Sequence, residues 1–173
     1  CHYSADSYVT FVSTSLDDGM SFVKPVKLGE NTNETALLHL GNKRWLAAAR
    51  TRDPADIHLY RSEDDGATWA DQGAVTRARQ HPGHLLRLAD GRLLLTYGDR
   101  VPEELGTQAM LSSDEGETWG EPLRLAEVTS GDSGYPASVQ LADGTIVTAY
   151  YAKSAPGCDR YHMGVVVWEP PAQ

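Results

Sequence analysis

Arginine is the side chain whose abundance in this sequence first suggests chemistry. The 173 residues contain eleven arginines and only four lysines. A guanidinium group presents its N–H donors in a fixed plane and can bind a carboxylate through two parallel hydrogen bonds, which an ammonium group cannot do. A local group of arginines could therefore hold a small anionic ligand, although a solvated position on a strand face is the more ordinary interpretation for any single arginine.

The overall charge and hydropathy exclude some partners. The formal net charge is −9 at pH 7, which argues against nucleic acid or an anionic membrane as a general partner. The apolar runs, such as 165–168, have the length of a strand and fall far short of the roughly 20 residues that span a bilayer. The sequence therefore predicts no membrane span.

The side chains that could bind a metal are not arranged for it. Cys1 and Cys158 are distant in the sequence, and His81, His84 and His162 have no close ligand partners. The acidic turns lack the number of ligands and the terminal glutamate of a calcium-binding loop. We expect no metal and no other cofactor, and ordinary surface or core positions for these histidines.

A short pattern occurs three times and indicates how the chain is built. Residues 62–69 (SEDDGATW) and 112–119 (SSDEGETW) share the frame Ser-x-Asp-x-Gly-x-Thr-Trp, and residues 15–22 (SLDDGMSF) form a degenerate third copy. The copies begin 47 and 50 residues apart, a period typical of stacked or radial repeats. The aspartate can accept hydrogen bonds from nearby backbone N–H groups, and the glycine can adopt a positive φ. The pattern predicts a rigid hairpin turn; three unrelated acidic turns are the alternative.

Glycine turns at a similar spacing separate strand-like segments. Three such turns each lie between two short apolar runs: Gly41-Asn42, Asp90-Gly91 and Asp143-Gly144. The strands expected of two consecutive units are 35–40, 45–50, 56–62 and 72–76, then 83–88, 92–97, 107–112 and 123–128. No segment of helical length shows apolar residues at i, i+3, i+4 and i+7. The sequence therefore predicts an all-β protein.

Four short antiparallel strands in a repeat of about fifty residues describe one blade of a β-propeller. The expected boundaries are the end of one blade at 1–31, with strands at 8–15 and 23–28, blades at 32–80 and 81–130, and an incomplete final blade at 131–173. Since a propeller needs about four to eight blades to close, we expect about three blades of a partial six-bladed β-propeller. The absence of an initiator methionine and the start partway through a blade favour a piece of a longer polypeptide, and a half that pairs with a second chain is the alternative.

The repeated turns resemble the Asp boxes, or BNR repeats, of the sialidase-like (neuraminidase) six-bladed propellers. The resemblance covers nearly the whole chain. It implies that Asp17, Asp64 and Asp114 are structural and lie at the periphery of the blades, on the face away from the active site. Asp boxes are specific for this hairpin and not for one enzyme, because other glycosidases, lyases and binding proteins also carry them. The resemblance alone also implies a secreted or periplasmic location.

The same resemblance implies catalytic residues on the inner strands. In sialidases, a glutamate near the start of an innermost strand is followed, one strand later, by an arginine that binds the substrate carboxylate. Residues 33–40 (NETALLHL) and 45–50 (WLAAAR) are similar to that arrangement, which makes Glu34 the base and Arg50 a member of the arginine cluster. Arg52 competes with Arg50, because residues two apart in a strand share a face. A solvated residue at a strand start is the alternative for Glu34.

Two more residues belong to the resemblance. Arg100 is the candidate for a second carboxylate-binding arginine, and Gln108 is a position where relatives could carry arginine instead. Residues 134–141 (GYPASVQL) are similar to the start of the final sialidase blade, which makes Tyr135 the nucleophile. A buried tyrosine that caps an inner strand is the alternative for Tyr135.

These residue types suit the cleavage of a sialic acid. The anomeric carbon of a sialic acid bears a carboxylate, so a neutral phenol approaches it with less repulsion than a carboxylate nucleophile would. A phenol with its ordinary pKa of about 10 needs a base, which is the role implied for Glu34. The resemblance thus implies part of a sialidase-like glycoside hydrolase, whose partners are a sialylated or other acidic glycan and either the missing N-terminal half or a second chain. The family's acid/base aspartate and first arginine belong to N-terminal blades. We therefore expect the isolated 173-residue chain to be inactive.

Two other functional classes are compatible with the sequence. An Asp-box glycosidase or lyase for another acidic sugar, such as a uronate, would keep the arginines without needing Tyr135. A non-catalytic carbohydrate-binding propeller would bind its ligand without needing Glu34 or Tyr135.

Overall fold

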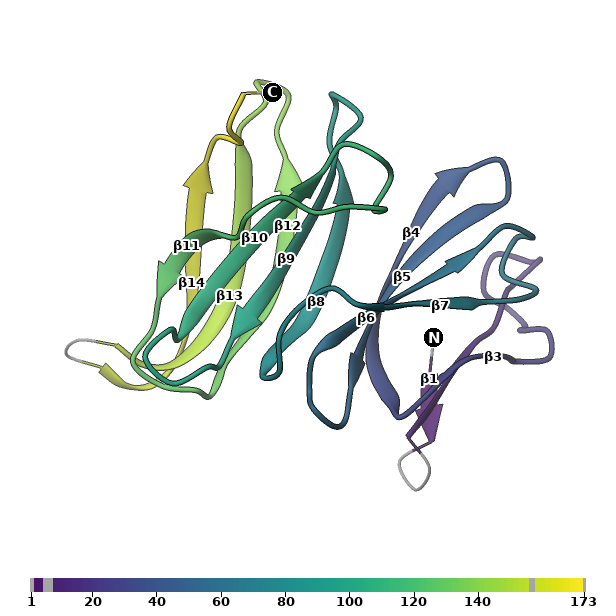
Figure 1. Ribbon diagram of the computed structural model, residues 1–173, viewed down its shortest axis with the longest axis horizontal. Helices are drawn as coiled ribbons and strands as arrows, with labels where there is room; N and C mark the ends of the chain where they lie inside the picture. The colour runs from purple at the N-terminus through teal and green to yellow at the C-terminus, as the bar shows by residue number, and fades with distance from the viewer. Residues whose placement is uncertain (1, 5–7, 156–157, 173) are drawn as a thin grey trace.

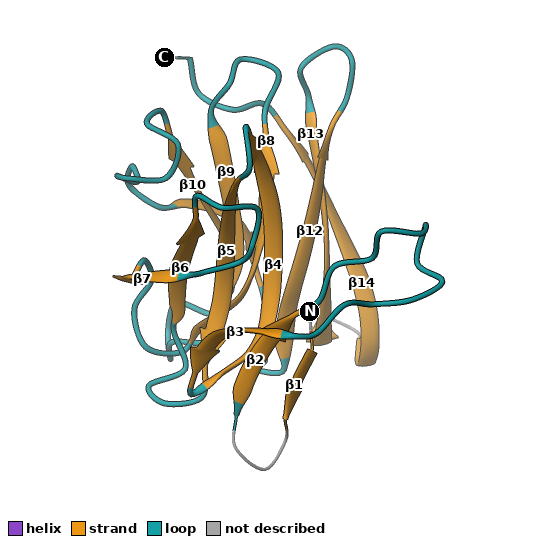
Figure 2. Ribbon diagram, turned by 90° about the vertical axis from the view of Figure 1, so that its right-hand side faces the viewer, coloured by secondary structure: helices purple, strands orange, loops and turns teal. Residues whose placement is uncertain are grey.

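The computed structural model describes residues 2–4, 8–155 and 158–172. Within these ranges the chain forms fourteen strands and no helix, so no described segment could cross a membrane as a helix (Figure 2). The strands lie in four antiparallel sheets that follow one another from the N-terminal to the C-terminal end of the chain (Figure 1). The prediction of an all-β chain is confirmed.

Each sheet is a meander of strands that are consecutive in the sequence. The first sheet consists of β1 (His2–Ser4), β2 (Val9–Val12) and β3 (Val26–Glu30), and the second of β4 (Thr32–Gly41), β5 (Arg44–Thr51), β6 (Ile57–Ser62) and β7 (Ala70–Ala74). The third consists of β8 (Gln80–Arg87), β9 (Leu93–Asp99), β10 (Gly106–Ser112) and β11 (Leu123–Glu127), and the last of β12 (Ser133–Gln140), β13 (Ile146–Ala155) and β14 (Cys158–Trp168). Such meanders are the blades of a β-propeller, and the chain forms part of one.

The first sheet contains one strand more than the sequence predicts. Strand β1 pairs with β2 in antiparallel register, with Ser4 opposite Val9. A strand of three residues is too short for an alternating hydrophobic pattern to reveal it. The two strands that were expected in this region correspond to β2 and β3.

The predicted glycine turns join the first two strands of three sheets. Gly41, Gly91 and Gly144 have φ angles of 90°, 92° and 92°. No atom lies within 4 Å of a Cβ built on any of these three glycines. Glycine is therefore favoured there by the left-handed backbone and not by lack of space.

The Asp boxes close the hairpins between β2 and β3, β6 and β7, and β10 and β11. In the last of these, Asp114 Oδ1 accepts the Thr118 N–H at 2.9 Å and Oδ2 accepts the Thr118 hydroxyl at 2.6 Å. These hydrogen bonds, with the one that Ser112 donates, lower the pKa of Asp114 to about 2. Asp64 and Asp17 accept the same set of bonds in their own turns. Each box is thus satisfied by groups of its own turn.

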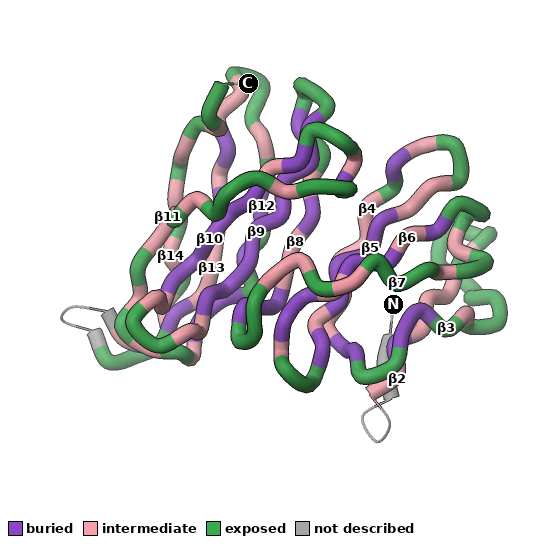
Figure 3. The backbone as a smooth tube through the Cα atoms, in the orientation of Figure 1, coloured by how far each residue is buried: buried purple, intermediate pink, exposed green. Residues whose placement is uncertain are grey.

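The sheets stack face to face, and the strands in the middle of the stack are buried on both sides (Figure 3). Leu93 and Leu95 of β9 pack in a cluster with Leu46 of the second sheet. Leu94, between them in the sequence, packs with Ile146 of the last sheet. Continuous apolar runs such as 93–95 are therefore expected here, because a strand covered on both faces needs apolar residues at every position.

The last sheet has one covered and one uncovered face. Its buried residues Ile146 and Thr148 face the third sheet, with Trp168 partly buried beside them. On the other face, Val139, Val165 and Val167 are 52%, 57% and 66% exposed. We call this surface, together with Met163, the uncovered face of the last sheet. Contiguous exposed apolar side chains of this kind mark surfaces that bind another structure.

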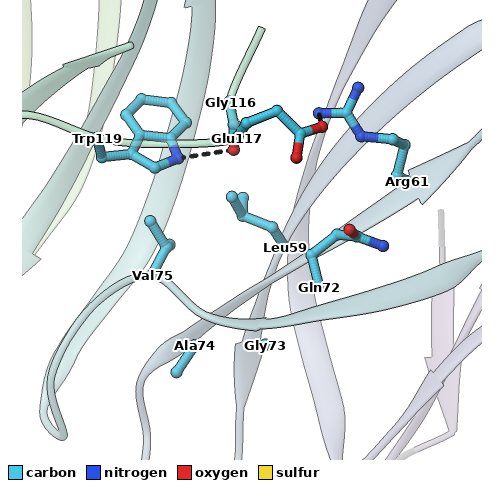
Figure 4. Close-up of a pocket in the computed structure, with 9 residues that line it drawn as sticks. All are labelled: Leu59, Arg61, Gln72, Gly73, Ala74, Val75, Gly116, Glu117 and Trp119. Carbon is cyan, nitrogen blue, oxygen red and sulfur yellow. Dashed lines mark hydrogen bonds and ion pairs between the residues drawn. The ribbon is translucent and has the colours of Figure 1, made fainter. Parts of the chain in front are cut away.

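The Asp box between β10 and β11 also contacts the outer strands β6 and β7 of the second sheet. Figure 4 shows Arg61 paired with Glu117 on one side of Leu59 and Trp119 on the other. Arg61 Nη2 lies 2.9 Å from Glu117 Oε1, and Trp119 Nε1 donates to the Gly116 carbonyl at 3.2 Å. A small pocket of about 160 Å³ lies among these residues. Packing and ion pairing therefore hold the second and third sheets together at their outer edges.

Replacing Leu95 by alanine is expected to lower the free energy of unfolding by about 2–5 kcal/mol, because a fully buried leucine is lost and a cavity remains. Urea unfolding of the 173-residue chain measures this. Val165→Ala, on the uncovered face, is the matched control and is expected to cost less than about 0.5 kcal/mol. A loss at Val165 equal to that at Leu95 would contradict the burial described above.

Replacing Asp114 by alanine is expected to lower the melting temperature at pH 7, because both Thr118 donors lose their acceptor. The folded-state pKa of about 2 lies below the ordinary value of 3.8. The carboxylate therefore stabilises the fold above about pH 4, and this stabilisation is lost as the pH falls through about 2.

Thermal melts at pH 7, 4 and 2 check this expectation. The difference between wild type and Asp114→Ala should shrink toward zero at the lowest pH. Glu121→Ala removes an exposed carboxylate next to the same hairpin. Its melting temperature should equal that of wild type at all three pH values. A difference at Asp114 that persists undiminished at pH 2 would contradict the pKa argument.

Candidate functional site

The inner strands β4, β8 and β12 each carry a β-bulge near their first residues. In each case the inner strand advances three residues while its partner, β5, β9 or β13, advances only two. The three intervals are Thr32 to Thr35, Gln80 to Gly83 and Gly134 to Ala137. A bulge re-aims a side chain out of the regular alternation and is frequent beside active sites. The residues inside the three bulges are Asn33 and Glu34, His81 and Pro82, and Tyr135 and Pro136.

Tyr135 has an unusual backbone conformation. Its φ is 49°, and the preceding Gly134 has φ of 124°. A bulky residue in the left-handed region is rare and costs about 1–3 kcal/mol, so the surrounding structure must hold it there. The side chain is 48% exposed, which does not fit a tyrosine that only caps the core.

Glu34 connects two sheets that are not neighbours. Its Oε1 accepts a hydrogen bond from the Tyr135 hydroxyl of the last sheet, 101 residues away in the sequence. Its Oε2 pairs with Arg50 Nη1 of β5 at 2.9 Å. The carboxylate is partly buried and has a partner for each oxygen, unlike a solvated residue at a strand start.

The Tyr135 phenol is protonated at neutral pH. Burial, the hydrogen bond to Glu34 and the charge of Glu34 raise its pKa to about 12, while Arg50 and Arg100 act in the opposite direction. The phenolic proton is directed at a carboxylate oxygen. The pair can therefore move a proton from Tyr135 to Glu34 when the phenol oxygen forms a new bond.

Arg100 reaches the same region from the third sheet. Its Nε donates to the Ser133 carbonyl at 2.9 Å, and its own carbonyl accepts a bond from Arg79 Nε at 3.0 Å. A Cβ built on Gly134 would lie 3.6 Å from Arg100 Nη2. The structure thus places Arg100 beside the bulge that carries Tyr135.

Arg52 and Gln108 lie elsewhere. Strand β5 ends at Thr51, so the alternation that would put residues 50 and 52 on one face stops, and the Arg52 guanidinium lies 4.2 Å from the centre of the Tyr8 ring. Gln108 is buried in the third sheet, where its Nε2 donates to Asp99 at 2.5 Å. Neither residue contacts Glu34 or Tyr135.

His81 is a member of this region that the sequence analysis missed. It is buried, and its Nδ1 has no hydrogen-bond partner. Burial and the charges of Arg50, Arg100 and Arg79 lower its pKa to about 3, so the imidazole is neutral at physiological pH. The signal available in the sequence was its place at the start of an inner strand, equivalent to the places of Glu34 and Tyr135 in the repeat.

A pocket of about 320 Å³ runs across the three inner strands at this point. Its lining comes from β4 (Glu34, Thr35, Ala36), β8 (Pro82, Gly83, His84) and β12 (Tyr135, Pro136). Among the described residues, no group of three or more His, Cys, Asp or Glu side chains could hold a metal ion. The ionisable groups gathered here are the Tyr135 phenol, the Glu34 carboxylate and the neighbouring guanidinium groups of Arg50 and Arg100.

Solved structures share this fold. A protein of unknown function from Dyadobacter fermentans is 27% identical, with a TM-score of 0.76 over 91% of this chain and 45% of that one. An α-L-arabinanase from Penicillium chrysogenum is 17% identical, with a TM-score of 0.68 over 95% of this chain and 55% of the enzyme. A sialidase from Trypanosoma rangeli, in a covalent intermediate with 2,3-difluorosialic acid, is 16% identical, with a TM-score of 0.67 over 94% of this chain and 27% of the enzyme.

This chain therefore spans about half, or less, of the length of the proteins that it resembles in structure. A comparison with curated protein sequences gives no significant match. The model of the BNR repeat-like domain, in contrast, matches residues 1–148, which include all three Asp boxes. The chain belongs to the BNR repeat-like domain family.

Proposed function

We propose that this chain is part of a sialidase-like glycoside hydrolase that removes a terminal sialic acid, or a related acidic sugar, from a glycan. The observation that carries the proposal is the hydrogen bond from the Tyr135 hydroxyl to Glu34, whose other oxygen is paired with Arg50. A nucleophile joined to a base, with the base held by a third group, is the arrangement of an activated nucleophile. An anionic substrate explains why the nucleophile is a phenol and the base is held by a guanidinium.

In the proposed reaction, Tyr135 Oη attacks the anomeric carbon while its proton passes to Glu34 Oε1. The glycosidic bond breaks through an oxocarbenium-like transition state, and the leaving oxygen takes a proton from an acid. A water molecule then attacks the anomeric carbon and gives one proton to the conjugate base of that acid. The glycosyl–tyrosine bond breaks, and the phenolate recovers its proton from Glu34. We assign the acid to a part of the propeller outside this chain.

The substrate carboxylate would bind at Arg50 and Arg100. The positive charges of both arginines lower the pKa of Tyr135, against the larger effects of burial and Glu34, so both charges act on the Tyr135 hydroxyl. His81 is neutral at physiological pH, so the positive charge available here comes from the arginines. Charge-assisted hydrogen bonds from guanidinium to carboxylate would orient the sugar ring above the phenol.

Further sheets would complete the ring. The uncovered face of the last sheet and the greater length of the similar structures support this part of the proposal. The occupant of that face would be the N-terminal part of the same propeller, and a second chain is the alternative. The 173 residues without such a partner should not turn over substrate.

Replacing Tyr135 by phenylalanine in the polypeptide with the complete propeller is expected to reduce kcat by about 10³-fold or more, because the nucleophile is lost. The assay is release of 4-methylumbelliferone from its N-acetylneuraminic acid glycoside. Tyr150→Phe, in the neighbouring strand β13, is the matched control and should keep near wild-type rates. Little change at Tyr135 would contradict the tyrosine nucleophile and favour a glycosidase or lyase for another acidic sugar.

Replacing Arg50 by alanine is expected to weaken binding of N-acetylneuraminate to the chain by about 10- to 100-fold, because a charge-assisted contact is worth about 1.5–3 kcal/mol. NMR titration of the 173-residue chain measures the dissociation constant. Arg52→Ala removes an equal charge two residues away, beside Tyr8, and should change the constant less than twofold. Equal losses at both positions would indicate a general effect of charge and contradict a specific site.

A further inference from the structure

A row of three tyrosines extends from the candidate site across the last sheet. Tyr135, Tyr151 and Tyr161 come from the adjacent strands β12, β13 and β14. The ring centres of Tyr135 and Tyr151 are 5.7 Å apart, and those of Tyr151 and Tyr161 are 6.2 Å apart. The rings are tilted by 44° and 42° to one another. The first member of the row, Tyr135, is the proposed nucleophile. Tyr151 therefore lies directly beside the candidate site, and Tyr161 lies one strand farther out.

One carboxylate fixes the two outer rings. The Tyr151 hydroxyl donates to Asp132 Oδ1 at 2.8 Å, and the Tyr161 hydroxyl donates to Oδ2 at 2.5 Å. The Lys153 N–H donates to the Asp132 carbonyl at 2.9 Å, and the Lys153 ammonium lies 5.6 Å from the centre of the Tyr161 ring. The positions of the rings are therefore set before any ligand binds, which reduces the entropy lost on binding.

The chemistry of this surface differs from that of the rest of the same face. Farther along β14 the exposed side chains are Met163, Val165 and Val167, which suit close packing against another sheet. At the Tyr161 end, phenol hydroxyls, a carboxylate and an ammonium surround the aromatic faces. The two hydroxyls and the Asp132 carboxylate already satisfy one another. A dry contact between sheets would, however, remove the charged Lys153 ammonium from water, which is unfavourable for a charge.

We propose that Tyr151 and Tyr161 form a platform for a neutral sugar ring, namely the residue to which the cleaved acidic sugar is attached. This inference rests on the proposed function for the identity of the cleaved sugar. Aromatic faces pack against the apolar C–H faces of a sugar. The Lys153 ammonium, which lies over the Tyr161 ring, would donate hydrogen bonds to the sugar hydroxyls. Asp132 and Lys153 carry opposite charges, so the platform favours a neutral ring over a second anion.

The test is binding of lactose, a neutral disaccharide, to the 173-residue chain, measured by saturation-transfer NMR. Tyr161→Ala is expected to weaken lactose binding at least fivefold, because the most exposed ring of the platform is lost. This residue is 61% exposed, so the substitution should leave folding intact, and a thermal melt verifies that. Val165→Ala, on the same face and strand, is the matched control and should change binding less than twofold.

Two results would contradict the platform: no saturation transfer to lactose at tens of millimolar, or an equal loss of lactose affinity in Tyr161→Ala and Val165→Ala. Failure of the proposed function would look different. A chain that binds lactose through Tyr161 but fails to bind N-acetylneuraminate at Arg50 would retain the platform and refute the sialidase assignment. The opposite pattern would retain the sialidase assignment and refute the platform.

Discussion

The burial of the third sheet on both faces is the constraint on which the rest of the structure depends. Glu34 belongs to the second sheet and Tyr135 to the last, and β8 of the third sheet lies between their strands, in contact with both β4 and β12. The hydrogen bond between Glu34 and Tyr135 can form only if two distances are fixed: that between the second and third sheets, and that between the third and last sheets. Apolar packing sets them, through Leu95 on one side and Leu94 on the other. A buried polar contact between Thr96 and Ser138 adds a directional restraint between the third and last sheets.

Local strain is concentrated where this packing can support it. Tyr135 has a left-handed backbone conformation at a bulge, and such a residue persists only when its surroundings over-determine it. The close approach of Gly98 to Gly134 is part of these surroundings, because a Cβ built on Gly98 would lie 2.9 Å from the Gly134 Cα. Two glycines therefore allow the third and last sheets to meet next to Tyr135, and the strained bulge directs its hydroxyl at Glu34.

The sequence was sufficient for the repeat and for most of the strands, because each has a local signature. The site candidates came instead from the family resemblance and stay predictions. Asp64 and Asp114 sit in a motif whose hydrogen bonds are made within eight residues, and Gly91 marks a turn by its own conformation. The position of Arg52 was harder to predict from the sequence, because it shares a strand face with Arg50 only if β5 continues past Thr51. Tyr161 could not be assigned from spacing, since its surroundings come from other strands. The position of His81 in the repeat was a signal, but charges that act on it come from other parts of the chain and could not be predicted. The bulges were invisible for the same reason: they are properties of the pairing between two strands.

The distribution of charge makes an acidic chain compatible with the anionic ligand proposed above. The net charge is −9, but part of the negative charge lies in the Asp-box hairpins, where donors of their own turns stabilise the charged carboxylates of Asp17, Asp64 and Asp114. At physiological ionic strength, exposed charges are screened over about 8 Å. A carboxylate in contact with Arg50 and Arg100 would therefore respond to these nearby cations more strongly than to the distant acidic turns. His81 is neutral because burial and the charges of Arg50, Arg100 and Arg79 lower its pKa, so the burial that stacks the sheets also keeps this imidazole from adding a further positive charge to the region.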